Sequence, residues 1–324
     1  MTTKSPLITL NNGVKMPALG LGVYQSTPEQ TAGAVETAIA CGYRLIDTAA
    51  AYFNERQVGE GIRRSGVKRD EVFVTTKLWI SDYGYEQTLR AFDASTRKLG
   101  LDYLDLYLLH WPVPSDFEAT VASYSAAERL LKDGRVRAIG VSNFSPKHLE
   151  DLATSGRAVP AVNQVELHPF FSQRELRDAH AKLGVVTQAW SPLGGVNVYF
   201  PKDPNAVKNP LAHPVVGRLA EKYGKTPAQV VLRWHIEHGI SAIPKSVRAE
   251  RIAENFDVFN FALTADEVAA TLRAALAYVP AERLYPCTNC GMVPLGREVA
   301  RAKLKALAAG AAVVRRELGG GETV

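Results

Sequence analysis

The sequence is poor in cysteine and has no long apolar run. It contains three cysteines in 324 residues, an odd number that argues against the disulfide framework of a secreted protein. No stretch approaches the ~18 apolar residues of a membrane span. The first ten residues, MTTKSPLITL, lack the apolar stretch and the cleavage site of a signal peptide. We therefore expect a cytoplasmic protein without a membrane partner.

A strong charge of one sign is also absent. The formal net charge is +5, and the basic residues are dispersed along the chain. They do not alternate with aromatic residues as they do in grooves that bind nucleic acids. The composition predicts no nucleic-acid partner and a mild preference for anionic small ligands.

The glycine pattern of a Rossmann dinucleotide-binding fold is incomplete. That fold requires G-x-G-x-x-G in the turn after its first strand. The run LGLGVY at residues 19–24 offers Gly20 and Gly22 but no third glycine at the right place. An open, doubly wound sheet is therefore disfavoured.

Short apolar runs instead alternate with amphipathic helical stretches. Residues 7–20 have the pattern of a β-hairpin around Asn12-Gly13, and eight strand–helix units follow. Capping-box patterns at residues 27–30 and 172–175 predict two of the helix starts. The strands are rich in Val, Ile and Leu, as parallel strands buried on both faces are. Eight units over roughly 250 residues predict an α/β fold, the (β/α)8 TIM barrel.

We expect the barrel to span residues 1–278 and residues 279–324 to form a C-terminal extension that packs on it, not an independent domain. In the extension, the alanine content of residues 298–317 favours a helix, and Cys287 and Cys290 form a C-x-x-C pair. A structural zinc site needs about four ligands, whereas no histidine follows residue 238. The pair therefore predicts no metal site.

Almost every strand-like run ends in a polar or aromatic residue. The chemistry of a TIM barrel collects at the carboxyl ends of its strands, so these residues are expected to form one site. In chain order they are Tyr24, Asp47, Lys77, His110, Ser142, Asn143, Gln164, Trp190, Ser191, Lys245 and Ser246.

Asp47, Tyr52, Lys77 and His110 suit proton transfer to an oxygen that becomes an alcohol. A free phenol has a pKa of about 10, and the ammonium of Lys77 is expected to lower the pKa of Tyr52. Asp47 would keep Lys77 charged, and His110 would orient a carbonyl oxygen. One histidine and one aspartate fall short of the ligands of a catalytic zinc. We predict a catalytic tetrad without a metal.

Reduction of a carbonyl also needs a hydride, which a nicotinamide cofactor supplies and side chains do not. Trp190 is expected to stack on the nicotinamide ring. Ser142, Asn143 and Gln164 are expected to hydrogen-bond its carboxamide.

The segment IPKSVRAERIAEN, residues 243–255, follows the eighth strand, where TIM barrels often build a phosphate site. It presents Lys245, Arg248 and Arg251. Arginine suits a phosphate monoester better than a ribose hydroxyl. The predicted cofactor is therefore NADPH/NADP+ rather than NAD.

These segments resemble the aldo-keto reductase superfamily, notably its bacterial members, over about residues 7–278. The matching segments are GYRLIDTAAAYFNE, TTKLW, YLLHWP, GVSNF, NQVELHP and IPKSVRAERIAEN. The resemblance implies a (β/α)8 barrel, NADPH bound without a Rossmann fold, and hydride transfer to an aldehyde or ketone with Tyr52 as the acid. It also implies cofactor contacts at Gly22, Val23, Tyr24, Ser191, Leu193, Lys245, Ser246, Val247, Arg248, Arg251, Glu254 and Asn255.

Tyr24, Trp79 and Trp111 follow strand ends and are expected to wall the substrate site together with His110. An aromatic wall accepts many small-molecule carbonyl substrates, so it does not identify one. We expect a monomer or a weak homodimer.

Two other functions deserve comparison. A cofactor-sensing regulatory subunit with little turnover would not need the intact tetrad. A Schiff-base aldolase would need Lys77 as a nucleophile, whereas pairing with Asp47 should keep this lysine protonated. Carbonyl reduction is therefore the favoured prediction.

Overall fold

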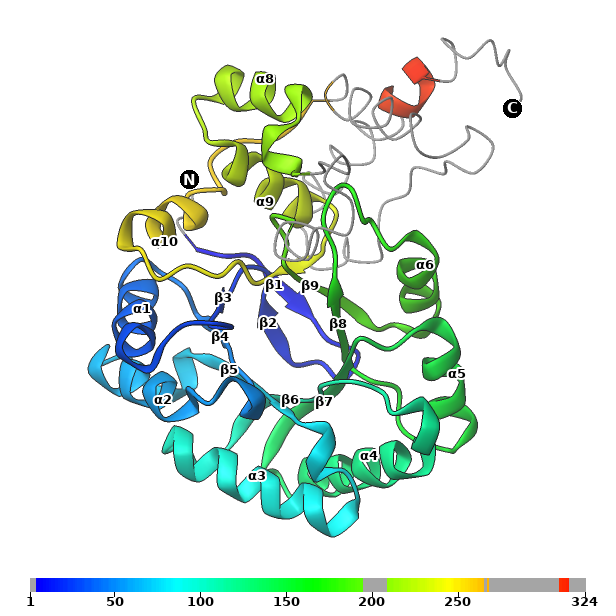
Figure 1. Cartoon of the computed structure of the whole chain (residues 1–324). Helices are drawn as coiled ribbons and strands as arrows, with labels where there is room; N and C mark the ends of the chain where they lie inside the picture. Colours follow the sequence, from blue (N-terminus) through cyan, green and yellow to red (C-terminus); the bar gives the residue numbers. More distant parts are fainter. Residues whose placement is uncertain (1–3, 195–208, 265–266, 268–308, 315–324) are drawn as a thin grey trace.

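Eight parallel strands form the centre of the computed structural model, which describes residues 4–194, 209–264, 267 and 309–314 (Figure 1). The strand order follows the chain, and parallel bridges join Leu19 to Ala242 and Gly22 to Lys245, so the first and last strands meet. The predicted (β/α)8 barrel is confirmed. The strands are β3 (Leu21–Gly22), β4 (Leu45–Asp47), β5 (Phe73–Leu78), β6 (Leu104–Leu109), β7 (Val136–Ser142), β8 (Val162–Glu166), β9 (Val186–Trp190) and β10 (Ser241–Ala242).

Helices surround this barrel, as Figure 1 shows. The described α-helices are α1 (Pro28–Ala40), α2 (Glu55–Arg64), α3 (Tyr85–Leu99), α4 (Phe117–Lys132), α5 (Pro146–Thr154), α6 (Arg174–Leu183), α8 (Pro214–Tyr223), α9 (Pro227–Glu237) and α10 (Ala249–Phe256). Among the helices of the described ranges, none is both long and apolar enough to cross a membrane.

The predicted hairpin, β1 (Leu7–Thr9) with β2 (Lys15–Pro17), closes the amino end of the barrel. Its residues Leu10 and Met16 pack in one buried cluster with Leu45 and Phe73, the first residues of β4 and β5. Because this end is filled with apolar side chains, the polar side chains of the strands gather at the opposite, carboxyl end.

One of the two predicted capping boxes is wrong. Gln30 accepts from the Thr27 backbone N–H at 3.5 Å, and α1 begins at Pro28 as expected. By contrast, α6 begins at Arg174 after Gln173, which has a left-handed backbone (φ 51°) and no side-chain cap. Gln173 instead donates a hydrogen bond to the carbonyl oxygen of Glu166 at the end of β8. This tie to the barrel sets the helix start.

Most of the predicted C-terminal extension, Cys287 and Cys290 included, lies outside the described residues. Residues 309–314 are helical, within the range 298–317 for which a helix was predicted. The domain boundary at residue 278 remains a prediction.

Helix α2 passes close to the end of α3 at Gly59. A Cβ atom at this position would lie 1.9 Å from the backbone oxygen of Leu99. We expect Gly59→Ala to reduce the free energy of unfolding by about 1–3 kcal/mol, because α2 must move away from α3. Urea unfolding followed by circular dichroism measures this change.

Gly33 in α1 provides the matched control, since a Cβ atom there would meet nothing within 4 Å. Gly33→Ala should leave stability unchanged or raise it by up to ~1 kcal/mol, because alanine favours the helix. Equal effects of both substitutions would contradict the close contact.

Candidate active site

Two tetrad side chains, Asp47 and Tyr52, converge on the ammonium group of Lys77. Asp47 ends β4, and Lys77 lies near the end of β5; both are buried. The Lys77 Nζ atom donates to Asp47 Oδ1 at 2.6 Å, to the Thr48 carbonyl oxygen at 3.0 Å and to the Tyr52 hydroxyl at 3.3 Å. An ammonium has three protons to donate, so all three have an acceptor.

The short 3-10 helix η1 (Ala50–Tyr52) carries Tyr52 over Lys77. The loop around η1 is fixed by Asn54, which is buried and was not predicted as a site residue. Its Nδ2 atom donates to the Val23 carbonyl oxygen at 2.9 Å, and its Oδ1 atom accepts from the Thr48 hydroxyl at 2.8 Å. The only indication of this role in the sequence is the position of Asn54, two residues after Tyr52. Asn54 therefore ties the Tyr52 loop to the ends of β3 and β4.

Burial and charge oppose each other in this cluster. Burial lowers the pKa of Lys77, but the negative charge of Asp47 and the Tyr52 phenol outweigh burial and raise it overall. Burial raises the pKa of the Asp47 carboxyl, and the charge and hydrogen bonds of Lys77 and Gln164 oppose that shift. Both carboxylate oxygens accept hydrogen bonds, which favours an ammonium paired with a carboxylate.

The predicted net lowering of the Tyr52 pKa is wrong for this structure. Burial raises the pKa of the phenol above 10.0, and Asp47 adds to the rise. The charge and hydrogen bond of Lys77 lower it, but by less. The phenol is therefore protonated at neutral pH, which is the state that a proton donor needs.

His110 follows β6 and faces both Tyr52 and Trp79. Its ring centroid lies 5.6 Å from that of Tyr52 and 5.1 Å from that of Trp79. Burial and the charge of Lys77 lower the pKa of His110 to about 3. The imidazole is therefore neutral and can donate one hydrogen bond to an oxygen beside the Tyr52 hydroxyl.

Asn143 joins Trp190 to His110. Its Oδ1 atom accepts from the Trp190 indole at 2.9 Å, and its Nδ2 atom donates to the His110 carbonyl oxygen at 2.9 Å. Ser142 donates to the Gln164 carbonyl oxygen at 2.8 Å. The side chains of Asn143 and Ser142 thus connect β8, Trp190 and the His110 backbone. The carboxamide contact predicted for them stays a prediction.

The Gln164 side chain fits a nicotinamide carboxamide. Its Nε2 atom donates to Asp47 Oδ2 and to Gln188 Oε1, both at 2.7 Å. Its Oε1 atom makes no hydrogen bond within the described part of the chain and remains an acceptor for the carboxamide N–H. Trp190, half-buried, lies on the neighbouring strand β9.

The residues predicted for the phosphate lie together where α10 begins. Lys245, Arg248 and Arg251 are exposed, and Arg248 caps α10 without a side-chain hydrogen bond. The Ser246 hydroxyl accepts from the Arg248 backbone N–H at 3.1 Å. Although Lys245 is largely exposed, partial desolvation lowers the pKa of its ammonium. Three cations beside a helix amino terminus suit a phosphate group.

The other predicted cofactor residues lie on adjoining segments. Glu254 accepts from the Thr226 hydroxyl at 2.7 Å, and Asn255 is buried beside it in α10. The remaining positions are at the ends of β3, β9 and β10, and they are Gly22 and Val23, both buried, Tyr24, exposed, and Ser191, Leu193 and Val247, all half-buried.

Aromatic side chains surround the tetrad on the outer side. The Tyr24 ring centroid lies 5.0 Å from that of Tyr52, and Trp79 contacts His110. Trp111, which is 43% exposed, follows His110 directly, and its carbonyl oxygen accepts from the Tyr83 hydroxyl. Tyr24 and Trp79 thus contact tetrad side chains, whereas Trp111 is placed only by its neighbour His110 in the chain.

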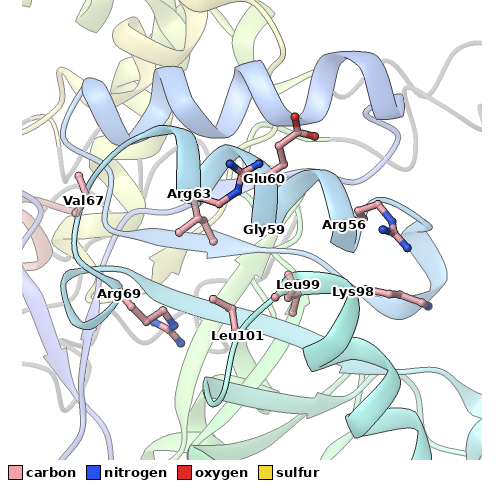
Figure 2. Close-up of a pocket in the computed structure, with 11 residues that line it drawn as sticks. Arg56, Gly59, Glu60, Arg63, Val67, Arg69, Lys98, Leu99 and Leu101 are labelled. Carbon is pink, nitrogen blue, oxygen red and sulfur yellow. The ribbon is translucent and has the colours of Figure 1, made fainter.

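A separate pocket of about 500 Å³ lies outside the barrel, between α2 and the end of α3 (Figure 2). Its lining includes four cations and no tetrad residue; the cations are Arg56, Arg63, Arg69 and Lys98. Arg69 is bound to buried Asp105 at 2.8 Å, and Lys98 to buried Glu55 at 3.5 Å. Arg63 and Lys98 also lie in last helical turns, where cations offset the helix dipole. Three of the four cations, Arg63, Arg69 and Lys98, thus have a structural role.

Comparison with known proteins identifies the family. Residues 17–275 match the Aldo/keto reductase family. The chain belongs to this family. Morphine 6-dehydrogenase of Pseudomonas putida is 58% identical over 270 residues, which are 83% of this chain and 91% of that protein. Glyoxal reductase of Bacillus subtilis is 46% identical over 268 residues, 82% of this chain and 92% of that protein.

Solved aldo/keto reductases share the fold. The crystal structure of a Bombyx mori aldo-keto reductase in complex with NADP has a TM-score of 0.76 and 37% identity, covering 83% of this chain and 92% of that chain. The predicted family is confirmed, and family membership makes this chain an oxidoreductase that acts on a carbonyl or its alcohol.

The lowered pKa of His110 gives a test of the site's electrostatics. We expect the imidazole to remain neutral from pH 8 down to about 5, because its pKa of about 3 lies far below the ordinary 6.5. Nitrogen NMR shifts of the ring, assigned with His110→Asn, measure this. A titration midpoint near 6.5 would show that the ring is not desolvated as the structure has it.

Proposed function

We propose that this protein reduces an aldehyde or ketone to an alcohol with NADPH, and that Tyr52 donates the proton. The observation that carries the proposal is the Tyr52 hydroxyl 3.3 Å from a buried ammonium that Asp47 holds in place. When bound, NADPH supplies the hydride. Tyr52 supplies the proton, so that carbonyl carbon and oxygen each gain one hydrogen.

Lys77 and Asp47 would stabilise the negative charge that proton transfer leaves on Tyr52. Loss of its proton leaves Tyr52 a phenolate, and the Lys77 ammonium stabilises that anion at hydrogen-bond distance. Asp47 keeps the lysine charged and fixed. His110 would donate a hydrogen bond to the same carbonyl oxygen and hold it beside the phenol.

The cofactor assignment rests on the charge at α10. Lys245, Arg248 and Arg251 would hold the 2′-phosphate of NADPH, whereas the NADH ribose offers no such anion. Trp190 and Gln164 would hold the nicotinamide. The NADP bound to the Bombyx mori relative supports this cofactor for the family.

The aromatic side chains predicted to line the substrate site favour uncharged or planar carbonyl compounds. Tyr24, Trp79 and Trp111 present aromatic surface around the tetrad. The names of the relatives mention a polycyclic alkaloid and a small dicarbonyl, so polycyclic ketones and dicarbonyl compounds are the first substrates to assay. The Schiff-base alternative is disfavoured, because the raised pKa of Lys77 keeps it from acting as a neutral nucleophile.

Tyr52→Phe should lower kcat/KM for a reactive aldehyde by about 10²- to 10⁴-fold, since it removes the proton donor. NADPH binding, followed by fluorescence, should be retained. Tyr124→Phe is the matched control, because the buried Tyr124 hydroxyl in α4 has no hydrogen-bond partner among the described residues. Full turnover by Tyr52→Phe would disprove the proposed acid. Binding without turnover by the wild type would favour a cofactor sensor.

The double variant Arg248→Ala, Arg251→Ala should raise the KM for NADPH by at least about tenfold, the worth of one hydrogen bond to a charged group. The KM for NADH and both kcat values should stay the same. Arg63→Ala, an exposed arginine of α2, serves as the control. Equal increases for NADPH and NADH would rule out a 2′-phosphate site here.

A further inference from the structure

Two glutamines and a serine form a hydrogen-bonded row inside the barrel. Gln164 on β8 is in register with Gln188 on β9, and Gln188 is in register with Ser241 on β10. None of the three side chains is more than 1% exposed. The row leads from the strand that closes the barrel to the catalytic Asp47, which lies across the barrel on β4.

The row leaves Gln164 one orientation. Both protons of its Nε2 atom are used, one for Asp47 and one for Gln188 Oε1. Turning the amide over would place its oxygen against the Asp47 carboxylate and the Gln188 oxygen. Two such contacts between acceptors in a buried site are unfavourable.

Gln188 is oriented in its turn. Its Nε2 atom donates to the Ser241 hydroxyl at 3.0 Å and lies 3.8 Å from the Met16 sulfur of the hairpin. These contacts direct the nitrogen toward β10 and the hairpin, so the oxygen faces Gln164. Met16 also belongs to the apolar cluster at the amino end of the barrel.

We propose that Gln188 is a positioning residue, which keeps the Gln164 oxygen turned toward the nicotinamide carboxamide and the Gln164 nitrogen toward Asp47. The inference rests on the proposed function, because it assigns the free Gln164 oxygen to the carboxamide N–H. Ser241 holds Gln188 in its orientation. One row of side chains thus fixes both cofactor recognition and the carboxylate of the tetrad.

The test compares NADP+ with its 3-acetylpyridine analogue, in which a methyl group replaces the carboxamide NH2. We expect the wild type to bind NADP+ about five- to tenfold more tightly, the worth of one hydrogen bond between uncharged groups. In Gln188→Leu this preference should fall to within about twofold. Affinity for 2′-phospho-ADP-ribose, which lacks the nicotinamide, should not change. Fluorescence titration measures all three affinities without turnover.

Two further variants keep the test decisive. Ser241→Ala removes the acceptor that orients Gln188 with little change in volume, and it should also reduce the preference for NADP+ over the analogue. This variant carries the test if Gln188→Leu does not fold. Thr75→Val should leave every affinity unchanged, because the buried Thr75 hydroxyl on β5 has no partner in the described ranges.

The outcomes separate this inference from the proposed function. A folded Gln188→Leu or Ser241→Ala that keeps the full preference would overturn the positioning role. A wild type that binds both cofactors equally would overturn it too, while leaving carbonyl reduction intact. A wild type that binds neither cofactor would overturn the proposed function and this inference together.

Discussion

The site depends on one ammonium group buried inside the barrel. Lys77 has no exposed surface, and three acceptors from separate positions surround it: Asp47 at the end of β4, the Thr48 backbone and Tyr52 on η1. A buried charge is costly unless every proton is paired, and removing one partner of such a pair typically costs about 3–5 kcal/mol. The same contacts that make the charge tolerable also bring the phenol to it. Folding and catalytic geometry are therefore linked at this point.

The barrel separates an apolar end from a polar end. The hairpin residues Leu10 and Met16 fill the amino end with apolar contacts. Above them lies the row of Gln164, Gln188 and Ser241, which reaches Asp47. Because the Gln164 and Gln188 side-chain nitrogens both have acceptors, the two buried amides can hold a single arrangement.

The sequence was sufficient for the barrel and for bringing Asp47, Tyr52, Lys77 and His110 to one end of it, because both follow from local patterns: apolar runs with a polar residue at their carboxyl ends. It was not sufficient for contacts between distant strands. Asp47 and Gln164 are 117 positions apart, and nothing in the chain marks Gln188 as the residue that orients Gln164. The direction of the Tyr52 pKa shift was also mispredicted, because it depends on how deeply the fold buries the phenol as well as on the neighbouring lysine. The start of α6 shifted because Gln173 bonds to β8.

In the proposed reaction the Lys77 ammonium stabilises the phenolate form of Tyr52. The most direct measurement is an NMR titration of the Tyr52 ring, labelled with carbon-13 at Cζ, in the wild type and in Lys77→Met. The lysine lowers the pKa of the phenol against the effect of burial, so Tyr52 in Lys77→Met should titrate at a higher pH than in the wild type. An unchanged or lower midpoint in a folded variant would contradict it.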